Sequence, residues 1–167
     1  AGSTAGRWTW HLIGRLQTNK VRAAVGRFAV IHSVDTLRLG EAIDDAASAA
    51  GIVQRVLVQV NLGDEPQKGG VAASGLRTLL ADLLRCPHAR VDGLMTIPPA
   101  ASDPEQVRPH FRELRRLGGE MARTVPGVTL ADYSMGMSGD FEAAVEEGAT
   151  MVRVGNAIFG PRERAAG

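Results

Sequence analysis

The chain has 167 residues, a length that fits one domain of ordinary size. Hydrophobic residues make up 44% and charged residues 22%, and 19 basic against 18 acidic residues leave a net charge of +1. This balance lacks the basic excess expected of a nucleic-acid-binding protein. The single cysteine, Cys86, excludes an internal disulfide and a cysteine-based zinc cluster. No apolar run approaches the roughly 20 residues of a membrane span, and together these features predict a cytoplasmic protein.

The first six residues show neither the charged start nor the apolar stretch of a signal peptide. They also lack an initiator methionine, and we expect that the beginning of the chain has been cut. No linker, low-complexity tract or charge block interrupts the residues that follow. Residues 1–167 are therefore expected to form a single domain.

Short apolar runs alternate with helical patterns along the chain, which is typical of βα units on a parallel sheet. The expected strands are residues 10–14, 28–34, 56–60, 91–95, 128–134 and 151–154. The helices expected between them begin near residues 16, 37, 76, 104 and 140. Asp35 is predicted to cap the second helix with its carboxylate. Periodicity leaves two architectures open, an open doubly wound sheet and part of a closed eight-stranded barrel, and six complete units favour the open sheet.

The segment Ser134-Met135-Gly136-Met137-Ser138-Gly139-Asp140 leaves the fifth strand and opens a helix. Glycines let a backbone approach a ligand closely, and the free N–H groups at a helix start attract anions. The serine hydroxyls would add side-chain donors. An ordinary turn with Asp140 as the helix N-cap explains the same residues equally well.

A second segment of this kind follows Arg153, where the sixth strand ends at Gly155 and Asn156. Two adjacent strand ends of this composition would form a phosphate cup like those at the last strands of many barrels. Arg153 stands between two valines and should point opposite to them, and a buried arginine needs a ligand or an acidic partner. A structural salt bridge is the alternative. We expect both segments to converge on one dianionic group.

Other chemistry finds little support in the sequence. His11, His32, His88 and His110 show no metal-ligand spacing and are interpreted as packing residues, so no metal site and no catalytic residue are predicted. The serines lack the surroundings of a hydrolase nucleophile, and the loop around Lys68 does not match a P-loop, which leaves Lys68 as a solvated residue.

Several longer motifs resemble one family. They are residues 10–20 (WHLIGRLQTNK), 31–35 (IHSVD), 58–61 (VQVN), 68–71 (KGGV), 93–99 (GLMTIPP), 134–138 (SMGMS) and 152–160 (VRVGNAIFG). In this order they resemble the signatures of the YggS/PROSC family of pyridoxal phosphate (PLP) homeostasis proteins. The resemblance extends from Trp8 to Arg162.

The resemblance implies a TIM-type (β/α) barrel of the kind found in the N-terminal domain of alanine racemase. It implies binding of PLP and a role as a PLP carrier or buffer without established turnover. The phosphate would lie at Ser134, Gly136, Met137, Ser138, Gly155 and Asn156. Arg153 would approach the pyridine nitrogen, and His11, Ile13 and Gly14 would border the ring.

Two strand segments of the family pattern, one with the Schiff-base lysine, have no counterpart here. Lys20 and Lys68 belong to other motifs, so we expect about six strands of an incomplete barrel and PLP held noncovalently or absent. The two unpaired sheet edges would then favour self-association. Three alternatives stay open: a fragment of a PLP-dependent racemase or decarboxylase, a phosphate-binding barrel enzyme without PLP, and an assembly module without a ligand.

Overall fold

The computed structural model describes residues 8–63, 65, 68–99, 101 and 103–160. The strands are β1 (His11–Leu12), β2 (Val30–Val34), β3 (Gln54–Asn61), β4 (Val71–Ala72), β5 (Ala89–Met95), β6 (Asp132–Met137) and β7 (Met151–Arg153). The α-helices are α1 (Val21–Ala24), α2 (Leu37–Ala49), α3 (Leu76–Leu83), α4 (Arg108–Thr124), α5 (Phe141–Glu146) and α6 (Asn156–Phe159). Short 3-10 turns precede α1, α3 and α4.

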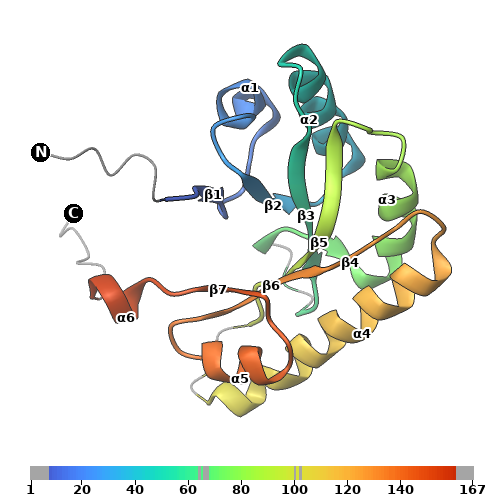
Figure 1. The fold of residues 1–167 in the computed structure, drawn as a ribbon. Coiled ribbons are helices and arrows are strands. Elements are labelled where there is room, and N and C mark those ends of the chain that lie inside the picture. The colour runs from blue at the N-terminus through green and yellow to red at the C-terminus, as the bar shows by residue number, and fades with distance from the viewer. Residues whose placement is uncertain (1–7, 64, 66–67, 100, 102, 161–167) are drawn as a thin grey trace, which may run out of the picture.

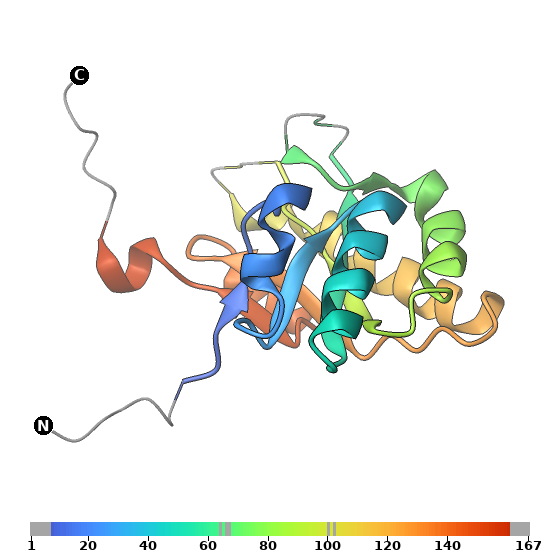
Figure 2. The ribbon, with the colours of Figure 1, turned by 90° about the horizontal axis from the view of Figure 1, so that it is seen from above.

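The strands form one parallel sheet in the order β1-β2-β3-β5-β6-β7, with β4 paired to β3 beside that path. In the described part of the chain, β1 and β7 each pair with one neighbour only. The sheet therefore stays open, and Figures 1 and 2 show the helices α2, α3 and α4 on one side of it. Each crossover returns the chain to the same end of the sheet, as parallel pairing requires.

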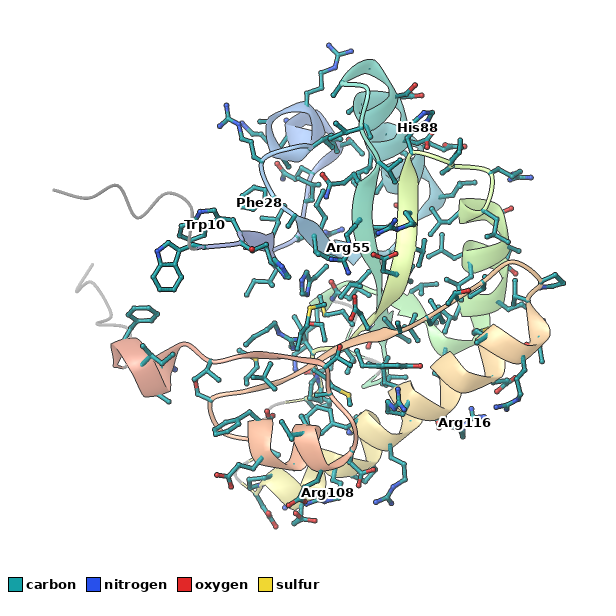
Figure 3. All side chains as sticks on the ribbon, viewed as in Figure 1. Trp10, Phe28, Arg55, His88, Arg108 and Arg116 are labelled. Carbon is teal, nitrogen blue, oxygen red and sulfur yellow. The ribbon has the colours of Figure 1, made fainter. Side chains whose placement is uncertain are left out.

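Successive side chains of each strand point to opposite faces of the sheet, and apolar residues form a buried cluster on each face. On β3, Val56, Val58 and Val60 belong to the large core that includes the helix residues facing the sheet, among them the fully buried Phe111 of α4. Leu57 points the other way and forms a smaller buried cluster with residues of β2 and β5. At one end of this second face, the Arg55 guanidinium (Figure 3) pairs with two carboxylates, Asp92 and Asp132.

The six expected strands all exist, and β4 is an additional short strand that the sequence did not indicate. For the strand expected at residues 128–134, the predicted first residue was wrong, since β6 begins at Asp132. The Val128 N–H donates within a turn to the Val125 carbonyl, and pairing with β5 begins only at Ala131, whose N–H donates to the Asp92 carbonyl. At its other end β6 extends to Met137, three residues farther than expected.

The N-cap assignment at α2 was also wrong, by one residue. The Thr36 hydroxyl accepts the Leu39 N–H at 3.3 Å and caps the helix. The Asp35 carboxylate instead accepts the Gly70 N–H at 3.2 Å and holds the loop that follows β3. The 13-residue helix ends as expected, with Gly51 in a left-handed conformation at φ 65°.

Replacing Thr36 by alanine is expected to lower the free energy of unfolding by about 1 kcal/mol, because the Leu39 N–H loses its acceptor at the helix start. Urea unfolding followed by circular dichroism measures this loss. The control is Thr18→Ala, at an exposed position without a capping bond in the structure. Equal stability losses in both variants would contradict the assignment of Thr36 as the cap.

In the part of the chain that the structure describes, no helix is both long enough and apolar enough to cross a membrane.

Candidate functional site

The ends of β6 and β7 lie side by side, as the sequence predicted. Met137 and Arg153 are paired across the two strands. Beyond them, the Ser138 hydroxyl accepts the N–H groups of Gly155 at 3.1 Å and Ala157 at 3.3 Å. One serine therefore joins the turn after β6 to the turn after β7.

A cleft of about 740 Å³ opens at these strand ends and reaches β1. It is lined by Thr9, His11, Ile13, His32, Met137, Ser138, Gly139, Met151, Val152, Arg153, Val154, Gly155 and Asn156. The lining combines apolar side chains, one cation and several backbone and hydroxyl groups. Ligand sites of α/β proteins are found at this end of the strands.

Among the described residues, Arg153 is the one lysine or arginine whose side chain lines this cleft. Its guanidinium donates to the Ser134 hydroxyl and to the Thr96 carbonyl, each at 2.8 Å. Burial lowers the pKa of Arg153 to about 10, against a weaker opposing effect of Asp140. Among the described residues no carboxylate pairs with it, so the structural salt bridge that the sequence allowed is not formed.

A chain of neutral groups continues from Arg153 into the protein. The Ser134 hydroxyl lies 2.9 Å from His32 Nδ1, and His32 Nε2 lies 2.9 Å from His11 Nδ1. Ser134 and His32 are buried, at 0% and 2% exposure. Burial, reinforced by His11 and Arg153, lowers the pKa of His32 to about 4, so its imidazole is neutral at physiological pH.

The depressed pKa of His32 predicts a loss of stability in mild acid. The unfolded chain takes up a proton below the ordinary value of 6.5, whereas the folded chain does so only near pH 4. Stability should therefore fall as the pH drops through this window, by about 2 kcal/mol between pH 7 and pH 5. Urea unfolding at both pH values measures the loss.

His32→Phe should reduce the acid sensitivity, because it removes the buried imidazole. Burial also lowers the pKa of His11, which adds to the effect in the same direction. An acid response that His32→Phe leaves intact would contradict the assignment.

The turn after β6 presents several hydrogen-bond donors to the cleft. The Ser138 oxygen accepts two N–H groups, which leaves the hydroxyl proton available for donation. The N–H groups of Gly139 and Asn156 donate to no described residue. The Asp140 carboxylate accepts the Met137 N–H and fixes the turn from within, in place of capping α5. These donors match the needs of an anionic oxygen group.

Seven of the ten residues predicted for the site line the cleft: His11, Ile13, Met137, Ser138, Arg153, Gly155 and Asn156. Ser134 lies beneath Arg153, and Gly136 packs against α5, where an added Cβ would stand 2.6 Å from the Ala144 Cβ. Gly14 borders a different hollow and accepts the Ser33 hydroxyl through its carbonyl.

Sequence reasoning missed the roles of His32 and Thr96. His32 was expected to be a packing residue, and its bond to Ser134 joins residues 102 positions apart in the chain. Thr96 contributes a backbone carbonyl, which no residue pattern reveals. No signal in the sequence pairs these residues with Arg153, because their approach depends on the curvature and register of the sheet.

Lys68 was expected to be solvated, and this was wrong. Its ammonium donates to the Pro98 carbonyl at 2.8 Å and pairs with the Glu65 carboxylate at 2.5 Å. Lys20 is exposed beside a second hollow near α2. Neither lysine lines the cleft that contains Arg153.

Comparisons with known proteins agree on one family. The family model of the alanine racemase N-terminal domain matches residues 5–163. The pyridoxal phosphate homeostasis protein of Aquifex aeolicus is 51% identical over 154 residues, which cover 92% of this chain and 67% of that protein. The Escherichia coli K12 protein of the same name is 39% identical over 92% of this chain and 65% of its own length.

Solved structures agree with this result. PipY of Synechococcus elongatus without PLP is 39% identical, with a TM-score of 0.87 over 93% of this chain and 72% of PipY. PipY with PLP bound gives a TM-score of 0.85 at 38% identity, over 91% of this chain and 70% of PipY. A diaminopimelate decarboxylase from M. jannaschii shares the fold, with a TM-score of 0.74 at 11% identity over 89% of this chain and 43% of that enzyme.

The open parallel sheet is thus an incomplete TIM-type barrel, as expected. The chain spans about two thirds of the length of the curated relatives it matches. From its sequence and its fold alike, the chain belongs to the alanine racemase N-terminal domain family and, within it, to the pyridoxal phosphate homeostasis proteins.

Proposed function

We propose that this chain binds pyridoxal 5′-phosphate in the cleft at the ends of β1, β6 and β7, and that it serves as a PLP carrier or buffer without turnover. One observation carries the proposal. A half-buried arginine that pairs with no carboxylate among the described residues and a turn with unused donors face the same cleft. PLP bound to the relative PipY and the shared family support the choice of ligand.

The residues present fit the phosphate group. Ser138, Gly139 and Asn156 offer one hydroxyl and two N–H donors at the joined turns. A dianion placed there would accept charge-assisted hydrogen bonds from these donors. Gly155 leaves room, since an added Cβ would meet no atom within 4 Å.

Arg153 is proposed to meet the pyridine nitrogen, while His11 and Ile13 border the ring. When bound, PLP supplies an electron-withdrawing ring to amine chemistry. A fixed cation beside the ring nitrogen disfavours protonation there and weakens this electron sink. The arrangement thus supports binding without turnover, and a racemase or decarboxylase is not favoured.

We propose that binding to this chain is noncovalent, because Lys20 and Lys68 both lie outside the cleft lining. Because noncovalent binding does not need the aldehyde, pyridoxine 5′-phosphate, which lacks it, should bind about as well as PLP. Residues 1–167 are proposed to act as one domain. Equal affinities for the two compounds would show that PLP binds in the cleft and does not merely react through its aldehyde with amines on the protein surface.

Isothermal titration calorimetry with both compounds tests the proposal. Ser138→Ala should weaken binding of each by about tenfold, because it removes one donor and releases two N–H groups from their acceptor. Ser48→Ala, at an exposed position on α2, serves as the matched control. Absence of binding in the unsubstituted chain, or equal affinity of both variants, would contradict the proposed site.

We also propose self-association through the open edges, in the cytoplasm and without a nucleic-acid partner. Large apolar side chains are exposed near both edges: Trp8 and Trp10 before β1, and Ile158 and Phe159 after β7. Figure 3 shows the Trp10 ring projecting from the β1 side. Edge strands with unpaired backbone groups and apolar neighbours favour association. Sedimentation velocity over a range of concentrations distinguishes a monomer from a larger species.

A further inference from the structure

We infer that His32 is a positioning residue for the ligand cleft, and that it holds the Arg153 guanidinium in place through the Ser134 hydroxyl. The inference rests on the proposed function and assigns a role to a buried group that touches no phosphate donor. It concerns four residues on four different strands: His11, His32, Ser134 and Arg153.

The direction of the hydrogen bonds follows from counting protons. An arginine side chain only donates, so Ser134 Oγ accepts from Arg153 Nη1. If the serine proton is donated to His32 Nδ1, then Nε2 carries the imidazole proton and donates to His11 Nδ1. The Ser134 hydroxyl and the His32 N–H, the two buried donors of this chain, then each have an acceptor.

The opposite direction leaves a donor unused. His11 would donate to His32 Nε2, and His32 Nδ1–H would donate to the Ser134 oxygen, which also accepts from Arg153. The hydroxyl proton of Ser134 would then have no acceptor among the described residues. At a fully buried side chain an unused donor is unfavourable, so the order Arg153 to Ser134 to His32 to His11 is preferred.

This order has a consequence for the cleft. Two of the five guanidinium N–H groups of Arg153 are used by Ser134 and Thr96, and the others donate to no described residue. A carboxylate in place of Ser134 would neutralise the cation, whereas a serine that is itself held by a neutral histidine leaves the charge available. The cleft therefore selects a ligand that presents an unprotonated acceptor to Arg153 and rejects one that presents a proton.

Nuclear magnetic resonance of the uniformly ¹⁵N-labelled chain tests the proton order without any ligand. Long-range ¹H–¹⁵N spectra at pH 7 should show His32 as a neutral imidazole with its proton on Nε2. The Arg153 Nη protons should exchange slowly with water. A proton on Nδ1, or a charged ring, would overturn the inference.

Variants test the positioning. His32→Phe keeps the ring volume without an acceptor, and Ser134→Ala removes the link. Each should speed the exchange of the Arg153 Nη protons and weaken pyridoxine 5′-phosphate binding by about tenfold. His32→Asn places an amide oxygen near the Nδ1 position and should restore the affinity to within about threefold. His88→Phe, the matched control, should change neither readout.

The double variant decides whether the two residues act together. If His32 acts through Ser134, the combination of His32→Phe and Ser134→Ala should cost about tenfold, as each does alone, whereas independent effects would multiply to about a hundredfold. Multiplying effects would overturn the inference. If pyridoxine 5′-phosphate fails to bind the unsubstituted chain, the proposed function fails, and the Arg153 proton exchange in the variants still decides the role of His32.

Discussion

Replacing Gly136 by alanine should destabilise the chain by about 3 kcal/mol and disorder the turn that joins β6 to α5. Gly136 has φ 92°, a conformation that side chains with a Cβ rarely adopt. An added Cβ would also stand 2.6 Å from the Ala144 Cβ and 3.1 Å from the Phe141 Cα. The second contact is with backbone, so α5 itself would have to move.

Gly139 provides the matched control three residues away. Its φ is not positive, and an added Cβ there would meet no atom within 4 Å. Gly139→Ala should therefore change stability by less than about 0.5 kcal/mol. Urea unfolding of both variants measures the difference. A Gly136→Ala chain as stable as the Gly139→Ala chain would mean that the backbone at Gly136 differs from the one described.

Replacing Arg153 by leucine should reduce the affinity for PLP and pyridoxine 5′-phosphate by about a hundredfold. Among the described residues the cleft then has no lysine or arginine side chain, and charge-assisted bonds are the stronger ones. Calorimetric titration gives the change in the dissociation constant. Arg116→Leu, on the exposed face of α4 (Figure 3), is the control for loss of one positive charge from the whole protein.

The same substitution should barely alter stability. Burial disfavours the charged form of Arg153, so leucine removes an unfavourable charge while it leaves the Ser134 hydroxyl and the Thr96 carbonyl with one partner fewer. These effects oppose one another, and the change in the free energy of unfolding should stay below about 1 kcal/mol. A large loss of both affinity and stability would mean that Arg153 holds the fold and not the ligand.

Much of the fold could be read from the sequence. The alternation of apolar runs and helical patterns predicted six parallel strands and the helices between them, because these patterns depend on local residue spacing. The motif resemblance then indicated the barrel, which periodicity left open against a doubly wound sheet. The boundaries were less accurate at residues 128–134, where pairing starts only after a turn that carries no clear residue signal.

The candidate site was partly predictable for the same reason. Carboxyl ends of neighbouring parallel strands meet at one edge of a sheet, so the segments that contain Ser138 and Gly155 had to lie together. Which side chains face the cleft was decided only by the tertiary structure. Alternation alone would place Ser134, Gly136 and Ser138 on the same face of β6.

The sequence by itself thus determined the succession of strands and helices and the two converging turns. The tertiary structure decided the order of the strands in the sheet and the division of roles between the serines. From Ser134 to Met137 the chain advances three residues on β6, while the paired β7 advances only two, from Met151 to Arg153. This irregularity, with the left-handed Gly136 inside it, interrupts the alternation. Ser138 therefore reaches the cleft, and Ser134 stays buried between Arg153 and His32, because strand register depends on contacts between segments that local residue patterns do not encode.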